Sequence, residues 1–311
     1  MKAVVIDQYG GIEVLKEREV NKPEINENQV LIEMHATSIN PIDWKIRQGY
    51  LKDMIPFQFP VILGWDAAGV IVEKGSKVDS FNVGDRVFAR PRTTAKGTYA
   101  EYVATEENLL AKIPDNISFN EAASVPLAAL TAWQCLLDIG TIKPGDKVLI
   151  HAGAGGVGTM AIQIAKNIGA YVATTGSGKN EEFLKELGAD VVIDYQNQDF
   201  EKVLKDYDFV LDTMGGDVQT KSYSVLKKGD LLVSIVSTPD AKVAAEYGVS
   251  GVFHMLSARG DQLQAIAKLM EDKKLKPIVG HVFDLSEQGL QAAHALSESH
   301  HAKGKIVIKI K

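Results

Sequence analysis

Residues 147–158 read KVLIHAGAGGVG, and this stretch decides the fold expected for the chain. Residues 147–150 have the character of a buried strand, and a glycine-rich loop follows directly. Apolar residues at helical spacing then continue to Ile168, and Gly169 ends the helix. Such glycines permit a tight turn and let the backbone approach a pyrophosphate at the helix N-terminus. The residues expected there are Gly153, Gly155, Gly156, Val157 and Gly158.

Downstream of this loop, strand and helix patterns alternate. Short apolar runs at residues 171–175, 191–193, 209–211 and 231–235 predict buried strands, and residues 181–187 predict a helix. Alternation of this kind specifies a parallel sheet with helices on both faces. The expected class is therefore α/β, with a doubly wound Rossmann sheet.

The chain on either side of this region has a different pattern. Before residue 120, short strands, many turns and scattered prolines predict a small β-rich, barrel-like domain. After residue 258, helix and strand are mixed, and residues 305–310 predict a closing strand. Lysine and hydrophobic residues alternate in that strand, as expected at a sheet edge, with Lys303 and Lys305 in solvent.

The strand after the glycine loop predicts which coenzyme binds. An NAD site usually carries an acid about 20 residues beyond the loop, where it binds the ribose 2′-hydroxyl. Between Thr159 and Asn180 the chain has no acid. Thr175, Ser177 and Lys179 offer hydroxyls and an ammonium instead, which suit a 2′-phosphate. The predicted coenzyme is NADP(H).

Composition excludes several classes of function. A length of 311 residues predicts about two domains. A formal charge of −6 argues against a nucleic-acid partner. No apolar stretch is long enough for a membrane helix and the N-terminus resembles no secretory signal, so a cytoplasmic protein is expected. The single cysteine, Cys135, reads as a buried helix residue rather than a nucleophile.

Several motifs in order resemble one enzyme superfamily. They are GWDAAGV at 64–70, VGDRV at 83–87, GTYAEY at 97–102, LTAW at 130–133 and KPGD at 143–146. With the glycine loop, they resemble the medium-chain dehydrogenases/reductases, and within them the NADPH:quinone oxidoreductase and enone (alkenal) reductase branch. The resemblance implies a GroES-like catalytic domain over residues 1–120 and a Rossmann domain over 121–257. It also implies a return to the first domain over 258–311, and a homodimer formed through Rossmann sheet edges.

Departures from the zinc-dependent pattern of this superfamily predict that no metal binds. Trp65 replaces the histidine of a Gly-His-Glu motif, and Asn40 stands where the first cysteine ligand belongs. Indole does not ligate zinc, and a usual catalytic zinc site needs three protein ligands. One cysteine also cannot build a four-cysteine lobe. The seven histidines are expected at the surface or in satisfied core positions.

The resemblance also implies roles for individual residues. Asn40 corresponds to a polar residue beside the nicotinamide and substrate, and Tyr50 to an aromatic over the active site. Thr131 resembles the threonine near the carboxamide, and Lys179 and Tyr195 resemble a pair flanking the 2′-phosphate. The residues expected to line the nicotinamide are Ser234, Val236, Ser237 and Phe253.

The expected reaction is direct hydride transfer from NADPH to a quinone or an α,β-unsaturated carbonyl. Such acceptors are already electrophilic, so holding them against the nicotinamide supplies much of the catalysis. Asn40, Tyr50 or a water would stabilise charge on the carbonyl oxygen. Two alternatives stay open: an enoyl-thioester reductase of the same fold, and a non-enzymatic NADPH-responsive binding or regulatory protein. Asp43 and Asp66 suggest an acid–base pair or, for Asp66, a turn brace.

Overall fold

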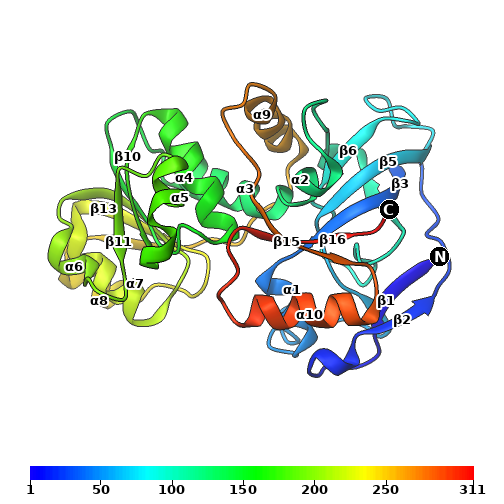
Figure 1. The fold of residues 1–311 in the computed structure, drawn as a ribbon, viewed down its shortest axis with the longest axis horizontal. Helices are drawn as coiled ribbons and strands as arrows, with labels where there is room; N and C mark the ends of the chain where they lie inside the picture. The colour runs from blue at the N-terminus through cyan, green and yellow to red at the C-terminus, as the bar shows by residue number, and fades with distance from the viewer. The chain divides into compact units, whose positions relative to one another are not determined.

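The computed structural model describes residues 1–311, which divide into two compact units (Figure 1). Unit 1 comprises Met1–Leu127, Ala258–Lys273 and Pro277–Lys311, and unit 2 comprises Ala128–Ser257 and Lys274–Lys276. No helix combines the length and apolar character needed to cross a membrane.

Unit 1 is built around a seven-stranded sheet with the order β15-β16-β3-β5-β6-β8, in which β7 also pairs with β3. A second sheet has the order β2-β1-β4. The strands are β1 (Lys2–Ile6), β2 (Lys16–Glu19), β3 (Gln29–Ile39), β4 (Val61–Ile62), β5 (Ala67–Lys74), β6 (Arg86–Ala89), β7 (Tyr102–Glu106), β8 (Leu110–Lys112), β15 (Val279–Asp284) and β16 (Lys305–Lys309). The helices are α1 (Pro41–Arg47), α2 (Phe119–Ala123), α9 (Gly260–Glu271) and α10 (Glu287–Glu298).

Strand β16 lies inside the sheet, so the expectation of an edge strand is wrong. It pairs with β15 on one side and with β3 on the other, which leaves β15 at the edge. Lys305 is only 4% exposed, whereas Lys303 and Lys309 are exposed. The alternation of lysine and hydrophobic residues cannot show that a lysine has a buried partner of opposite charge. Here Asp66, 239 positions away in the sequence, is that partner of Lys305.

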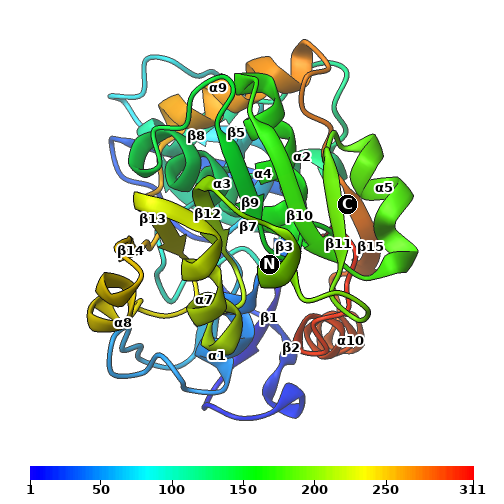
Figure 2. The same ribbon diagram turned by 90° about the vertical axis from the view of Figure 1, so that its left-hand side faces the viewer.

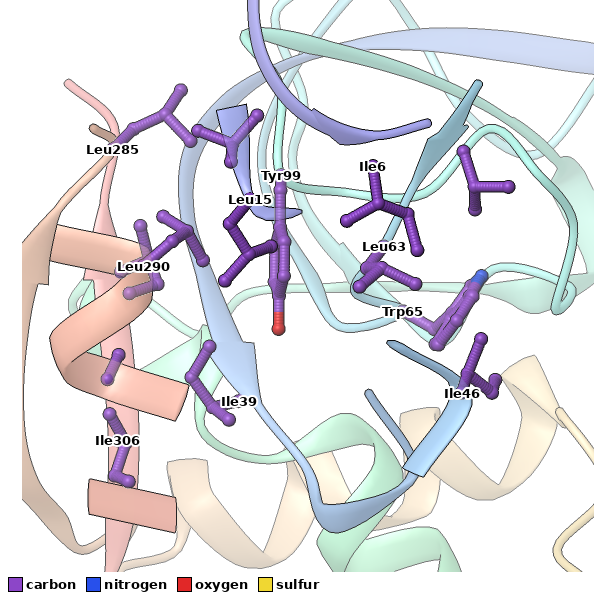
Figure 3. Close-up of a cluster of buried hydrophobic side chains, with 14 residues drawn as sticks. Ile6, Leu15, Ile39, Ile46, Leu63, Trp65, Tyr99, Leu285, Leu290 and Ile306 are labelled. Carbon is purple, nitrogen blue, oxygen red and sulfur yellow. The ribbon is translucent and has the colours of Figure 1, made fainter. Parts of the chain in front are cut away.

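The core of unit 1 joins its first and last segments. Ile6, Leu63, Trp65 and Tyr99 from the N-terminal part pack with Leu290 from α10 in one buried cluster (Figure 3). Helix α10 contacts β15, β16 and α1, so the C-terminal segment completes the N-terminal domain. Apolar burial of this kind supplies most of the driving force for folding.

Unit 2 contains an all-parallel sheet with the order β11-β10-β9-β12-β13-β14 (Figure 2). The strands are β9 (Lys147–Ile150), β10 (Tyr171–Gly176), β11 (Val191–Asp194), β12 (Tyr207–Asp212), β13 (Leu226–Ser234) and β14 (Ser250–Phe253). The helices are α3 (Pro126–Trp133), which begins in unit 1, α4 (Gly156–Ile168), α5 (Glu181–Glu186), α6 (Phe200–Val203), α7 (Gly216–Ser222) and α8 (Ala241–Glu246). A π-helix, Gln134–Ile139, follows α3 and contains the buried Cys135.

The order of these strands reverses at β9. Right-handed crossovers therefore place the helices of the two halves on opposite faces of the sheet. This is the doubly wound arrangement expected from the sequence.

Candidate active site

The predicted coenzyme-binding residues of unit 2 gather at one edge of its sheet. All six strands are parallel, so their carboxyl ends share that edge, and β9 and β12 meet there at the reversal of strand order. Open α/β sheets bind ligands at such a switch point. The predicted residues that end or follow these strands are Gly153, Gly155, Gly156, Val157, Gly158, Thr175, Ser177, Lys179, Tyr195, Ser234, Val236, Ser237 and Phe253. Thr131 lies in α3, where it is buried.

The three signature glycines of the loop differ in what the fold requires of them. A Cβ at position 153 would lie 2.1 Å from Thr174 Oγ1, and one at position 158 would lie 2.4 Å from Ala152 O. Gly155 has an extended backbone (φ −78°, ψ 174°), and a Cβ there would meet only Ala152 O, at 3.3 Å. Packing therefore requires glycine at positions 153 and 158, whereas the space that faces the Cα of Gly155 is open.

His151 connects the start of the glycine loop to its neighbours. Its Nδ1 lies 3.1 Å from Thr175 Oγ1 and its Nε2 lies 2.8 Å from Ser222 Oγ. Because Ser222 donates its hydroxyl hydrogen to Val218 O, the imidazole must donate from Nε2 and accept at Nδ1. Burial lowers the pKa of His151 to about 4, so the ring is neutral.

Asp212 organises the loops beyond β12 and β13. Its Oδ1 accepts hydrogen bonds from the backbone of Met214 (2.9 Å) and Gly215 (2.8 Å). Its Oδ2 accepts from Gln219 Nε2 (2.9 Å) and Ser234 Oγ (2.7 Å). Four donors satisfy this fully buried carboxylate and hold both loops in place.

The end of β10 presents an unpaired cation. Lys179 is exposed, and its ammonium has no partner in the structure. Tyr195, at the end of the neighbouring strand, is 55% exposed. Thr175 is buried and already bonded to Ala152 N and His151, so its hydroxyl positions the glycine loop.

Asp194, at the end of β11, is an acid that contacts this turn. Its carboxylate accepts hydrogen bonds from the backbone of Gln196 and Gly178 and from Asn197 Nδ2 (2.6 Å). The contact with Gln196 is the main cause of its lowered pKa. Gln196 and Asn197 belong to the loop that follows β11, whereas Gly178 N ties the carboxylate to the turn that follows β10.

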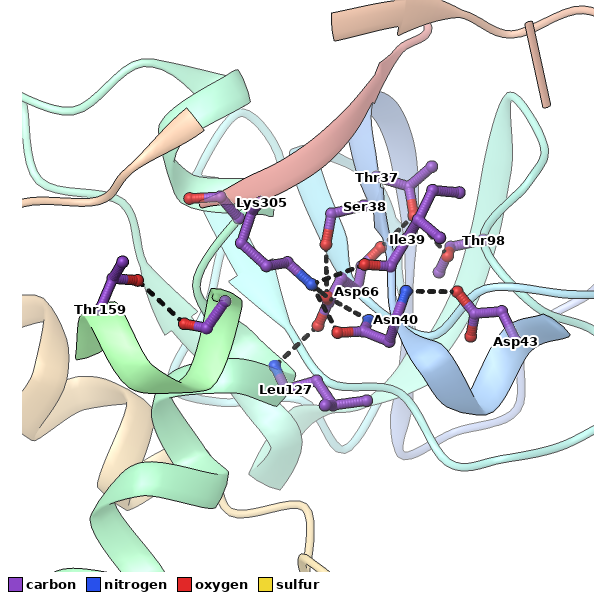
Figure 4. Close-up of polar contacts among 12 residues, drawn as sticks. Thr37, Ser38, Ile39, Asn40, Asp43, Asp66, Thr98, Leu127, Thr159 and Lys305 are labelled. Carbon is purple, nitrogen blue, oxygen red and sulfur yellow. Dashed lines mark hydrogen bonds and ion pairs between the residues drawn. The ribbon is translucent and has the colours of Figure 1, made fainter. Parts of the chain in front are cut away.

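In unit 1, Asn40 is 2% exposed at the junction of β3 and α1, within a cluster of buried polar groups (Figure 4). Its Nδ2 donates to Asp66 Oδ2 at 2.7 Å, and its Oδ1 accepts from Lys305 Nζ at 2.5 Å. Ser38 Oγ also donates to Asp66 Oδ2, at 2.5 Å. Asp66 Oδ1 accepts from Leu127 N in the first turn of α3, which agrees with a bracing role for this aspartate.

Asp43 holds the backbone of Asn40 from the other side. Its Oδ2 accepts from Asn40 N and from Tyr99 OH, both at 2.8 Å, while its buried Oδ1 has no partner. Burial raises the pKa of Asp43 to about 7.

Tyr99 continues this chain of hydrogen bonds to α10. Its hydroxyl lies 3.1 Å from His294 Nε2, and His294 Nδ1 lies 3.0 Å from Arg47 Nη1. A guanidinium can only donate, so Nδ1 accepts and Nε2 carries the hydrogen. Burial lowers the pKa of His294 to about 3 and keeps it neutral. Both buried histidines, His151 and His294, are therefore satisfied core residues.

Tyr50 has a different environment from Asn40. It is 70% exposed, and its ring packs edge-on against Trp44, with ring centroids 6.4 Å apart. Its hydroxyl makes no hydrogen bond within the chain. Tyr50 is therefore not part of the buried cluster.

The position of a usual zinc ligand is filled by a buried indole. Trp65 is fully buried, and its Nε1 donates to Thr94 O at 3.3 Å. No group of three or more His, Cys, Asp or Glu side chains is arranged to hold a metal ion.

Sequence reasoning missed His151, Asp212 and Lys305 as organisers of these regions. Two of them left a signal: His151 directly precedes the glycine loop, and Asp212 ends a buried strand just before a Gly-Gly turn. Lys305 left none, because its alternating strand is typical of an exposed edge.

Comparisons with known proteins match this architecture. Residues 26–115 match the alcohol dehydrogenase GroES-like domain, and residues 187–308 match a family described as zinc-binding dehydrogenase. The chain is 37% identical to the chloroplastic NADPH-dependent alkenal/one oxidoreductase of Arabidopsis thaliana, over 99% of this chain and 79% of that protein. It belongs to the medium-chain dehydrogenase/reductase superfamily, in the quinone oxidoreductase and alkenal/one oxidoreductase branch.

Solved structures of this superfamily superpose over the whole chain. The quinone oxidoreductase from Coxiella burnetii is 39% identical with a TM-score of 0.92, covering 100% of this chain and 99% of that one. The Escherichia coli quinone oxidoreductase complexed with NADPH is 28% identical with a TM-score of 0.90, covering 99% and 100%. The chain is therefore an NAD(P)H-dependent oxidoreductase with a GroES-like domain and a Rossmann-like domain.

Proposed function

We propose that this enzyme transfers hydride from NADPH to a quinone or an α,β-unsaturated carbonyl without a metal ion. The observation that carries the proposal is the open space before Gly155 together with the unpaired ammonium of Lys179. The first fits a pyrophosphate at the N-terminus of α4, and the second fits a 2′-phosphate beyond β10. NADPH supplies the hydride when bound.

The residues at the end of β10 favour NADPH over NADH. An NAD site would place a free carboxylate against the ribose 2′-hydroxyl. Here the carboxylate of Asp194 is already occupied by Gln196 and Asn197 of its own loop and by Gly178 N, while the Lys179 ammonium is unpaired and can meet a phosphate. Tyr195, whose backbone N–H donates to Gly176 O at the end of β10, offers an exposed ring and hydroxyl.

Asn40 is the donor that we assign to the carbonyl oxygen of the acceptor. Hydride addition to a quinone or enone builds negative charge on that oxygen, and a preorganised N–H stabilises it. Tyr50 is too exposed and too weakly held to provide a preorganised donor, so we assign it a packing role against the acceptor. The proton that completes the reduction comes from solvent.

Metal-free reduction is supported by the residues at the ligand positions of the zinc-dependent relatives. Trp65 cannot ligate a metal, and the amide of Asn40 is engaged by Lys305 and Asp66. Elemental analysis of purified enzyme should find less than stoichiometric zinc, and activity should survive a chelator. Stoichiometric zinc that is needed for turnover would refute this part of the proposal.

The experiment that tests the function follows coenzyme absorbance while quinones, short enals and enones are offered with NADPH or NADH. We expect consumption of NADPH and transfer of deuterium from C4-deuterated NADPH to the product. Tight NADPH binding without turnover on any of these acceptors would favour the thioester or regulatory alternatives.

Coenzyme choice is tested with Lys179→Ala and a matched control, Lys185→Ala. Lys185 lies nearby in α5 and pairs with Glu181. Loss of one charge-assisted contact costs about 1.5–3 kcal/mol, so the Kd for NADPH should rise roughly 10- to 150-fold in Lys179→Ala. The Kd for NADH should be unchanged in both variants. Equal weakening of NADPH and NADH would show that Lys179 does not contact the 2′-phosphate.

A homodimer is proposed through strand β14. This strand forms one edge of the unit 2 sheet, and Val252 on it is 40% exposed. Exposed edge strands readily pair with a second chain. Light scattering should give twice the mass of the 33.8 kDa chain, and Val252→Asp should give a monomer. A monomeric wild-type enzyme would exclude this interface.

A further inference from the structure

The buried cation of Lys305 has no hydrogen left for a ligand. An ammonium has three N–H donors. In the structure they are directed to Ile39 O (2.9 Å), Asn40 Oδ1 (2.5 Å) and Asp66 Oδ2 (3.4 Å). With the side chain 4% exposed, Lys305 cannot donate a hydrogen bond to a bound molecule without breaking one of these contacts.

The same contacts leave the Asn40 amide only one favourable orientation. Its oxygen faces the Lys305 ammonium, and its nitrogen faces the Asp66 carboxylate (Figure 4). Rotating the amide by half a turn would set N–H against ammonium and oxygen against carboxylate, so both contacts would become repulsive. One Nδ2 hydrogen is used by Asp66, and the second has no acceptor within the chain.

The cluster contributes little to stability that apolar residues could not supply. Taking two charges out of water costs several kcal/mol per ion, and apolar residues of similar volume are often equally or more stabilising. Asp66 and Lys305 come from loops and strands 239 positions apart, yet both converge on one asparagine side chain. Fixing the direction of that side chain is a role that apolar replacements could not perform.

We propose that Lys305 and Asp66 are positioning residues that hold the Asn40 amide in one orientation, with its second Nδ2 hydrogen directed to the oxygen of the bound acceptor. The inference rests on the proposed function for the identity of that acceptor. The orientation of Asn40 itself rests only on the contacts within unit 1. Ser38, which donates to the same Asp66 oxygen, and Leu127 N, on the other oxygen, keep the carboxylate in place.

The test separates charge balance from positioning. Lys305→Met and Asp66→Asn each leave one buried charge unpaired, so each single variant should lose stability. The double variant Lys305→Met/Asp66→Asn removes both charges at nearly constant volume and should regain most of the stability in urea. Lys309→Met, at the exposed end of the same strand, is the matched control and should behave as wild type.

The kinetic readout is kcat at saturating NADPH, with the Kd for NADPH measured separately. Loss of one oriented donor typically lowers kcat by about 100- to 1,000-fold. If the donor is present but free to rotate, kcat should fall by about tenfold or more. We expect the double variant to keep the reduced kcat although its stability returns, with the Kd for NADPH within about twofold of wild type. Recovery of kcat together with stability would overturn the proposal.

A cycle with Asn40→Ala tests whether the effect passes through this side chain. In the Asn40→Ala background, the double substitution should lower kcat no further. An equal reduction of kcat with and without Asn40 would overturn the positioning role.

A spectroscopic readout keeps this inference separate from the proposed function. In protein labelled with ¹⁵N-asparagine, the side-chain amide of Asn40 is the signal missing from Asn40→Ala. We expect one sharp pair of amide protons in wild type, and shifted or broadened signals in the double variant. If wild type reduces no acceptor, the function fails while this spectrum still decides the orientation; an Asn40 signal unchanged in the double variant would refute it.

Discussion

Replacing Asp43 by Asn should remove a loss of stability that the wild-type enzyme suffers as the pH rises toward neutrality. Asp43 is fully buried, and burial raises the pKa of its carboxyl from 3.8 to about 7. Between these values the folded chain holds a proton that the unfolded chain has released. The free energy of unfolding therefore falls as the pH rises through this window, and the loss is complete above the folded pKa.

The magnitude follows from the two pKa values. One pH unit inside the window corresponds to about 1.36 kcal/mol. Between pH 5 and pH 8 the wild-type enzyme should lose roughly 2–3 kcal/mol of stability through this group. An asparagine oxygen at position 43 can still accept from Asn40 N and Tyr99 OH, and its amide group does not titrate. Asp43→Asn should thus match wild type near pH 5 and exceed it by about this amount at pH 8.

Urea unfolding followed by tryptophan fluorescence can measure this difference in unit 1, which contains Asp43. Trp44 and Trp65 lie in unit 1 and Trp133 lies in unit 2, so a Trp133→Phe background reports on unit 1 alone. Asp53→Asn, an exposed carboxylate in the loop after α1, is the control for charge removal. A stability difference between wild type and Asp43→Asn that stays constant from pH 5 to pH 8 would refute the reasoning, as would one that grows toward low pH.

Two further predictions follow from the loop and the thiol. Gly155→Ala should change the free energy of unfolding by no more than about 1 kcal/mol, because a Cβ meets only one atom there, but it should raise the Kd for NADPH strongly. Gly158→Ala should unfold at a lower urea concentration, because its Cβ would lie 2.4 Å from Ala152 O. Titrations with NADPH and with urea distinguish the two variants, and an equal loss of stability in both would contradict the different roles given to Gly155 and Gly158. Burial raises the pKa of Cys135 to about 12, so a thiol reagent should label it only in denatured protein, and rapid labelling of native protein would contradict its burial.

Local patterns predicted the Rossmann-like half of the chain well. The strand, loop and helix at residues 147–169 form a contiguous unit whose periodicity and glycines are visible in one window. The predicted coenzyme residues then fall at one sheet edge, because parallel strands place all their carboxyl ends together. Their roles in binding stay predictions.

The buried polar cluster of unit 1 could not be predicted in the same way. Lys305 pairs with Asp66 across 239 positions, and His294 meets Tyr99 across 195. No short-range pattern distinguishes a lysine paired inside a sheet from one on a solvated edge. Asn40 was found through its place in a family motif, but the groups that orient it became visible only in the fold.

The two halves of the enzyme use buried polar groups for the same purpose. In unit 2, neutral His151 and fully bonded Asp212 hold the loops at the carboxyl ends of β9, β12 and β13. In unit 1, Asp66, Lys305 and Asp43 hold the amide and backbone of Asn40. His151, Asp212, Asp66 and Lys305 make their hydrogen bonds within the chain, whereas the backbone at Gly155, the Lys179 ammonium and one Asn40 N–H remain available to a ligand. Holding the glycine loop and the Asn40 amide in place before a ligand arrives lowers the entropy lost on binding.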